Sequence, residues 1–129
     1  MVDWVRYAAS EHGLAERLEE AAGDVERALG TVKALGGRES QSEYPVCMLA
    51  PEGRLLVGFI DLLLARDGEI VVIDFKTDAP PVPGATLGDY PEYGRQLEIY
   101  VEALRATGLV EGRVRAGLLF TGTGEFLWL

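Results

Sequence analysis

Two aspartates, Asp61 and Asp74, lie inside apolar stretches where a carboxylate is out of place. The stretches Leu55 to Ala65 and Ile70 to Phe75 are rich in aliphatic and β-branched residues, which is typical of β-strands. Between them stands Asp67-Gly68, the dipeptide that most strongly indicates a two-residue hairpin turn. Such a turn fixes the register, and it predicts that Asp61 lies directly opposite Asp74, provided that no β-bulge intervenes.

Directly opposed residues of an antiparallel pair share one face of the sheet, and Lys76 shares the face of Asp74 because side chains alternate. Two carboxylates in this position repel each other, so a divalent cation is the simplest group to hold them. Oxygen ligands favour Mg²⁺ or Mn²⁺, and a nearby lysine suits the charge that develops on a phosphate under attack. This set predicts phosphodiester hydrolysis; the alternative is a solvated surface ion pair between Asp74 and Lys76.

The motifs G-F-I-D-L-L-L and D-F-K-T around these residues are followed by Q-x-x-x-Y at Gln96 and Tyr100. In this order they resemble the RecB-like nuclease domains of the PD-(D/E)XK superfamily, which end bacterial helicase-nucleases of the RecB and AddA type. The resemblance covers about 43–129. It implies an α/β fold, a restriction-endonuclease-like sandwich with a mixed central β-sheet flanked by helices.

The resemblance also implies the roles of individual residues. Lys76 would be the catalytic lysine, and Gln96 with Tyr100 would support the site and the DNA strand. Metal ligands would be Asp61, Asp74 and the backbone carbonyl of Phe75. The implied activity is a Mg²⁺- or Mn²⁺-dependent deoxyribonuclease, an exonuclease acting on DNA ends or single strands. Its partner would be a helicase domain or subunit, in DNA repair and recombination.

The chain departs from the family at the first motif, a helix that carries a histidine metal ligand. Its one histidine is His12, in surroundings that match the motif poorly. His12, with Glu11 and Glu16, either completes the metal site or belongs to a solvated helix face. A second reading is therefore a catalytically inactive module that binds DNA or braces a helicase. A third, a hydrolase of small phosphorylated substrates, is less favoured because no basic residues cluster outside the hairpin.

Composition sets further limits. The length of 129 residues fits one domain, with a helical part over 1–36 and a nuclease core over 43–129. A net charge of −9 opposes DNA binding, so weak affinity is expected of this chain alone. The lone Cys47 excludes an internal disulfide and a four-cysteine iron-sulfur cluster. The chain has neither an apolar run of membrane-helix length nor a signal peptide, which predicts a cytoplasmic protein without membrane contact.

The remaining elements follow from periodicity and turn residues. Residues 3–35 read as helical, with a break at Gly23-Asp24 where Asp24 would cap a second helix. A connector over 36–42 precedes a strand over 44–49, with Glu43 at its start interpreted as structural rather than catalytic. A helix over 91–107 carries Arg95 and Arg105, the natural phosphate contacts. Two strands follow, at 114–121 and 125–129.

Overall fold

The computed structural model describes residues 18–77 and 83–129. Within these ranges the helices are α2 (Leu18–Ala34), the short 3₁₀ helix η2 (Leu87–Asp89) and α3 (Pro91–Ala106). The strands are β1 (Glu39–Leu49), β2 (Leu55–Arg66), β3 (Glu69–Lys76), β4 (Arg113–Phe120) and β5 (Phe126–Trp128). The predictions for His12, Glu11 and Glu16 lie outside the described residues.

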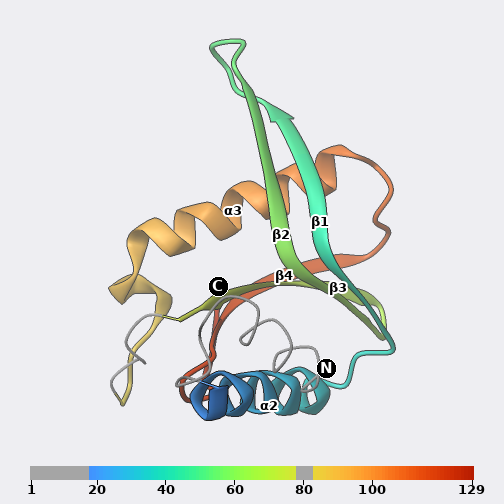
Figure 1. The fold of residues 1–129 in the computed structure, drawn as a ribbon. Helices are drawn as coiled ribbons and strands as arrows, with labels where there is room; N and C mark the ends of the chain where they lie inside the picture. The colour runs from blue at the N-terminus through green and yellow to red at the C-terminus, as the bar shows by residue number, and fades with distance from the viewer. Residues whose placement is uncertain (1–17, 78–82) are drawn as a thin grey trace.

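The strands form one five-stranded sheet in the order β1-β2-β3-β4-β5, and a helix covers each face (Figure 1). Strands β3 and β4 are parallel and the other neighbours antiparallel, so the sheet is mixed. A core of buried side chains that includes Val72, Leu97 and Phe120 lies between the sheet and α3. A smaller core with Val71 and Ile73 faces α2. This confirms the predicted α/β sandwich.

The hairpin between β2 and β3 has the register that the sequence predicts. Arg66 pairs with Glu69 around the Asp67-Gly68 turn, and the pairing runs without a bulge to Leu62 and Ile73. Glycine is suited to this turn because Gly68 has a φ of 71°. The short loop therefore aligns the strands that carry the candidate catalytic residues.

Two boundary predictions are wrong. The polar segment that reads as a connector over 36–42 is in part strand, because β1 begins at Glu39 and pairs with β2 as far as Ala65. Helix α2 also continues through Gly23 and Asp24 without a break. Asp24 does not cap a second helix; it forms an ion pair with Arg27 one turn later on the same helix.

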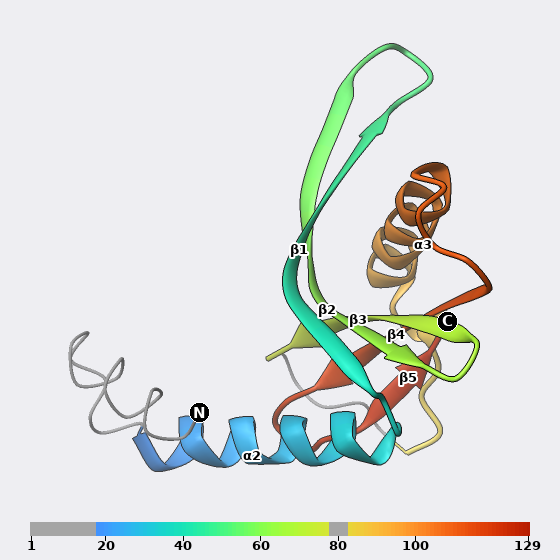
Figure 2. The ribbon, with the colours of Figure 1, turned by 90° about the vertical axis from the view of Figure 1, so that its right-hand side faces the viewer.

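Strand β2 bends where it passes Asp61. Its neighbours on either side pack into different cores, since Ile60 belongs to the core under α3 while Leu62 packs toward α2. The pairing of β1 with β2 is interrupted at Glu43 and Asp61, and Glu43 has a φ of 52°, which is unusual for a residue with a side chain. Beyond this bend the β1–β2 hairpin stands away from β3 (Figure 2).

Candidate active site

The carboxylate of Asp61 takes the place of a main-chain acceptor at the end of the β2–β3 ladder. Hydrogen-bonded pairs alternate along an antiparallel ladder, so the pair at Leu62 and Ile73 would be followed by one at Ile60 and Phe75. Instead, the Phe75 amide donates to Asp61 Oδ2 over 2.8 Å. The strands therefore separate at Asp61, and its side chain bridges the gap to the backbone of β3.

Asp74 is a buried carboxylate, with 5% of its surface exposed, among apolar neighbours in β3. Burial raises its pKa from 3.8 to about 6; a hydrogen bond to Asp61 and the Asp61 charge act in the same direction, while Lys76 opposes them. The two carboxyl groups therefore meet on one side of the sheet, as the hairpin register predicts. Within the described residues, Asp74 Oδ2 is buried and accepts no hydrogen bond of ordinary geometry.

Lys76 lies on the same face of β3 as Asp74, two residues further along. Its Nζ is 2.8 Å from Asp74 Oδ2, a contact close enough for an ion pair although not aligned as a hydrogen bond. Burial acts to lower the pKa of Lys76, but the contact with Asp74 and its charge outweigh burial and raise that pKa. The amine therefore stays protonated and can neutralise negative charge.

Helix α3 brings Gln96 and Tyr100 over these carboxylates. Gln96 Nε2 donates a hydrogen bond to the Tyr100 hydroxyl over 3.1 Å, the partner that the sequence predicts for this phenol. The Tyr100 ring lies over Gly58 of β2, where a Cβ would be 3.5 Å from its Cε1. Burial and then the Asp74 charge raise the pKa of Tyr100, so its hydroxyl remains a proton donor.

Tyr93, which sequence reasoning assigns only to the apolar face of α3, also belongs to this cluster. The Nζ of Lys76 lies 4.1 Å from the centroid of the Tyr93 ring, a cation–π contact. One helical turn separates Tyr93 from Gln96, and a tyrosine at this spacing was the available signal. It could not be interpreted without knowing which part of β3 the helix crosses.

The donor set fits a hard divalent cation. Asp61 and Asp74 supply carboxylate oxygens, and one of them is a buried oxygen without a hydrogen bond. The amide and carbonyl of one strand residue point to the same side, so the Phe75 carbonyl is directed toward β2 and Asp61 like its amide. In the described part of the chain no cluster of three or more acidic, histidine or cysteine side chains completes a metal site.

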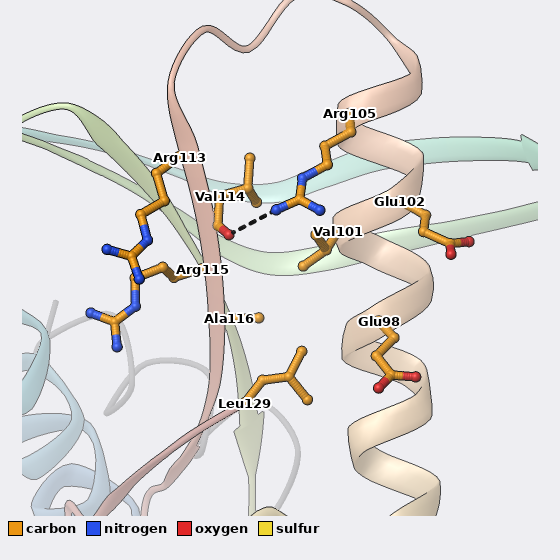
Figure 3. A pocket seen from close by; sticks show the side chains of 9 residues that line it. All are labelled: Glu98, Val101, Glu102, Arg105, Arg113, Val114, Arg115, Ala116 and Leu129. Atoms are coloured by element: carbon orange, nitrogen blue, oxygen red, sulfur yellow. Dashed lines mark hydrogen bonds between the residues drawn. The ribbon is translucent and has the colours of Figure 1, made fainter.

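The two arginines predicted as phosphate contacts lie at opposite ends of α3. Arg95 lines a shallow groove together with Tyr93 and Gln96, beside the carboxylates. Arg105 instead extends toward the start of β4, where it donates to the Val114 carbonyl over 3.5 Å (Figure 3). The pocket at that end, of about 500 Å³, is separate from the carboxylate site.

Comparison with known proteins gives the family. A profile of the PD-(D/E)XK nuclease superfamily matches residues 2–126. The chain belongs to the PD-(D/E)XK nuclease superfamily. Nucleases of this superfamily generally use divalent metal ions, in agreement with the oxygen donors brought together at the ends of β2 and β3.

A curated relative is an ATP-dependent helicase/nuclease polypeptide of Desulforudis audaxviator (strain MP104C), which is 31% identical over 154 residues. The alignment covers 98% of this chain but 12% of the relative's length. The similarity to a helicase-nuclease agrees with the RecB-like resemblance of this PD-(D/E)XK chain. In the residues that the structure describes, no helix is both long and apolar enough to cross a membrane.

Proposed function

We propose that this chain is the metal-dependent nuclease domain of a helicase-nuclease and hydrolyses phosphodiester bonds at DNA ends or in single strands. The observation that carries the proposal is Asp74 Oδ2, a buried oxygen without a hydrogen bond, next to Asp61 and Lys76. A buried carboxylate lowers stability unless a partner compensates for its lost hydration. A cation shared by the two aspartates would supply that compensation.

Mg²⁺ or Mn²⁺ would be held by Asp61, Asp74 and the carbonyl of Phe75, with His12 as a further ligand. When bound, such an ion activates water as a nucleophile and neutralises charge on the phosphate. Asp61 would be oriented for this task by the Phe75 amide, which occupies its Oδ2 and leaves its other oxygen for the ion. The backbone of β3 therefore fixes one ligand relative to the other.

The protonated Lys76 would donate a hydrogen bond to a nonbridging phosphate oxygen, whose negative charge grows during in-line attack. Asp74 occupies one side of the amine, and the three N–H donors of a lysine leave others for the substrate. Because Gln96 donates to the oxygen of Tyr100, the Tyr100 hydrogen is available to an acceptor on the DNA strand.

The proposed partners are DNA and a helicase domain or subunit, in DNA repair and recombination in the cytoplasm. The relative's name joins helicase and nuclease in one polypeptide, and the matching segment is 12% of its length. A helicase would deliver the strand, which suits a nuclease chain whose net charge of −9 gives little attraction for DNA. Exonuclease action is the corresponding proposal, because a translocating helicase presents free ends.

The second candidate is a catalytically inactive module that binds DNA or braces a helicase. Two observations favour it: two carboxylates, but no third acidic, histidine or cysteine group, gather at the site within 18–77 and 83–129, and the chain as a whole is acidic. An inactive module would bind a helicase or DNA without cutting it, and its behaviour would not depend on Asp74.

Cleavage assays distinguish the two. An end-labelled linear single strand and a closed circular single strand are incubated with the chain in Mg²⁺, in Mn²⁺ and with a chelator. The nuclease proposal predicts metal-dependent loss of the linear strand but not of the circle, and no cleavage by folded Asp74→Ala. Lys76→Ala should slow cleavage by about 10²–10³-fold, the usual cost of losing one charge-stabilising donor. Cleavage by either clean variant at the wild-type rate would contradict the proposal.

A further inference from the structure

The amine of Lys76 is held between two groups of different chemistry. The side chain is 18% exposed, and its Nζ contacts Asp74 Oδ2 on one side, at 2.8 Å. On another side it faces the Tyr93 ring, with 4.1 Å between Nζ and the ring centroid. A ring face within about 6 Å attracts an ammonium group through its quadrupole, and more strongly when water is excluded.

The Tyr93 ring is itself held in place by a row of aromatic residues. It stacks on Tyr90 with 5.9 Å between ring centroids and an interplanar angle of 7°. Tyr90 in turn packs against Phe120, at 5.5 Å and 50°, and Phe120 is fully buried. In the parallel register of β3 and β4, Phe120 is the partner of Lys76. The row therefore begins at the sheet position beside Lys76 and returns to its amine.

An aromatic ring restrains a lysine without consuming its hydrogen bonds. A second carboxylate at this position would accept N–H donors and neutralise the charge, whereas a ring attracts the cation and accepts no directed bond from it. We propose that Tyr93 is a positioning residue that holds Lys76 Nζ beside the Asp61–Asp74 pair, with N–H donors left for the substrate phosphate. The catalytic part of this inference rests on the proposed nuclease function.

Lysine NMR tests the contact without any cleavage. The chain has two lysines, Lys33 and Lys76, so protein labelled with ¹³C at lysine Cε gives two resolved methylene signals. Lys33, exposed in the last turn of α2, is the internal control. The Lys76 signal should be shifted upfield by the ring current of Tyr93. This shift should remain in Tyr93→Phe and disappear in Tyr93→Leu; a shift unchanged in Tyr93→Leu would overturn the inference.

Kinetics test the positioning role. At saturating metal and DNA, Tyr93→Leu should lower kcat by about 5- to 30-fold with KM unchanged, and Tyr93→Phe should restore most of the rate. The matched control is Tyr44→Leu, which removes a half-buried aromatic residue of β1 and should preserve both the Lys76 shift and the rate. A wild-type rate in Tyr93→Leu after loss of the shift would overturn the positioning role.

Folding of each variant is checked by circular dichroism, and Tyr93→Met replaces Tyr93→Leu if the leucine variant does not fold. The two hypotheses fail in different ways. A wild-type chain that cuts no DNA contradicts the nuclease function, while the lysine spectrum still decides whether Tyr93 holds Lys76. A wild-type chain that cuts DNA, with a Lys76 signal independent of Tyr93, contradicts this inference alone.

Discussion

The Phe75 amide donates its hydrogen bond to Asp61 Oδ2, 2.8 Å away, where a regular hairpin would offer the Ile60 carbonyl. One carboxylate thus closes the β2–β3 ladder and also faces Asp74 across it. Asp61 therefore has a structural role that can be separated by mutation from its proposed role as a metal ligand.

The first prediction concerns Asp61. Asp61→Ala leaves the Phe75 amide without its acceptor, which should lower the free energy of unfolding by about 1–3 kcal/mol. Asp61→Asn keeps an oxygen acceptor but removes the charge, so its loss of stability should be clearly smaller. Urea denaturation of the metal-free proteins measures both. Equal stability of the alanine and asparagine variants would show that the Phe75 hydrogen bond contributes nothing.

Asp74 should lower the stability of the metal-free protein at neutral pH. Because burial raises its pKa from 3.8 to about 6, its stabilising contribution is complete below 3.8 and is lost as the pH rises through 6. Asp74→Asn, which mimics the protonated carboxyl, should therefore be more stable than wild type at pH 7.5, by about 3 kcal/mol at most.

The pH dependence supplies the control for this second prediction. Since the difference arises from ionisation of Asp74, it should shrink as the pH falls from 7.5 to 4. Denaturant titrations of both proteins across this range measure it. An asparagine variant less stable than wild type at pH 7.5, or a difference independent of pH, would argue against a destabilising buried carboxylate at this position.

A third prediction concerns the space that Gly58 leaves for Tyr100. A Cβ at this position would be 3.5 Å from Tyr100 Cε1, an ordinary contact, so Gly58→Ala should cleave DNA at close to the wild-type rate. Gly58→Leu extends further into the ring and should displace Tyr100 from the carboxylates, slowing cleavage by about 10²-fold. Equal rates for the two variants would mean that the placement of Tyr100 does not matter for the reaction.

The fourth prediction compares the arginines at the two ends of α3. Arg95 borders the groove shared with Tyr93 and Gln96, whereas Arg105 donates to Val114 far along the helix (Figure 3). Arg95→Ala should weaken single-strand binding and reduce the dependence of log K on log salt by about 0.7, the effect of one phosphate contact. Arg105→Ala should leave both unchanged. Fluorescence anisotropy over a salt series measures the slopes, and the opposite ranking would reverse this assignment.

The sequence predicts the central hairpin well because its register depends on a local signal. The turn at Asp67-Gly68 determines every pair along β2 and β3, and this brings Asp61 and Asp74 together. The separation of the strands at Asp61 is not contained in that signal. It depends on the bend shared with Glu43, a residue whose positive φ no sequence rule predicts.

Other differences have equally physical causes. The first residues of β1 are polar and exposed, so they lack the alternation of apolar residues that marks a half-buried strand, yet they pair through their backbone. Gly23 and Asp24 look like a helix boundary, but the burial of Ala22 holds α2 to the protein through this segment. The contact of Tyr93 with Lys76 depends on how α3 crosses β3, which only tertiary packing decides.

Calorimetric titration of the metal-free chain with Mn²⁺ tests the central claim most directly, because it needs neither DNA nor a helicase. Wild type, Asp61→Asn and Asp74→Asn are compared after each has been shown to fold. The account predicts saturable binding to wild type that is lost in both variants, together with a rise in the unfolding temperature of wild type alone. Saturable binding of equal affinity in all three proteins, or none in the wild-type chain, would contradict it.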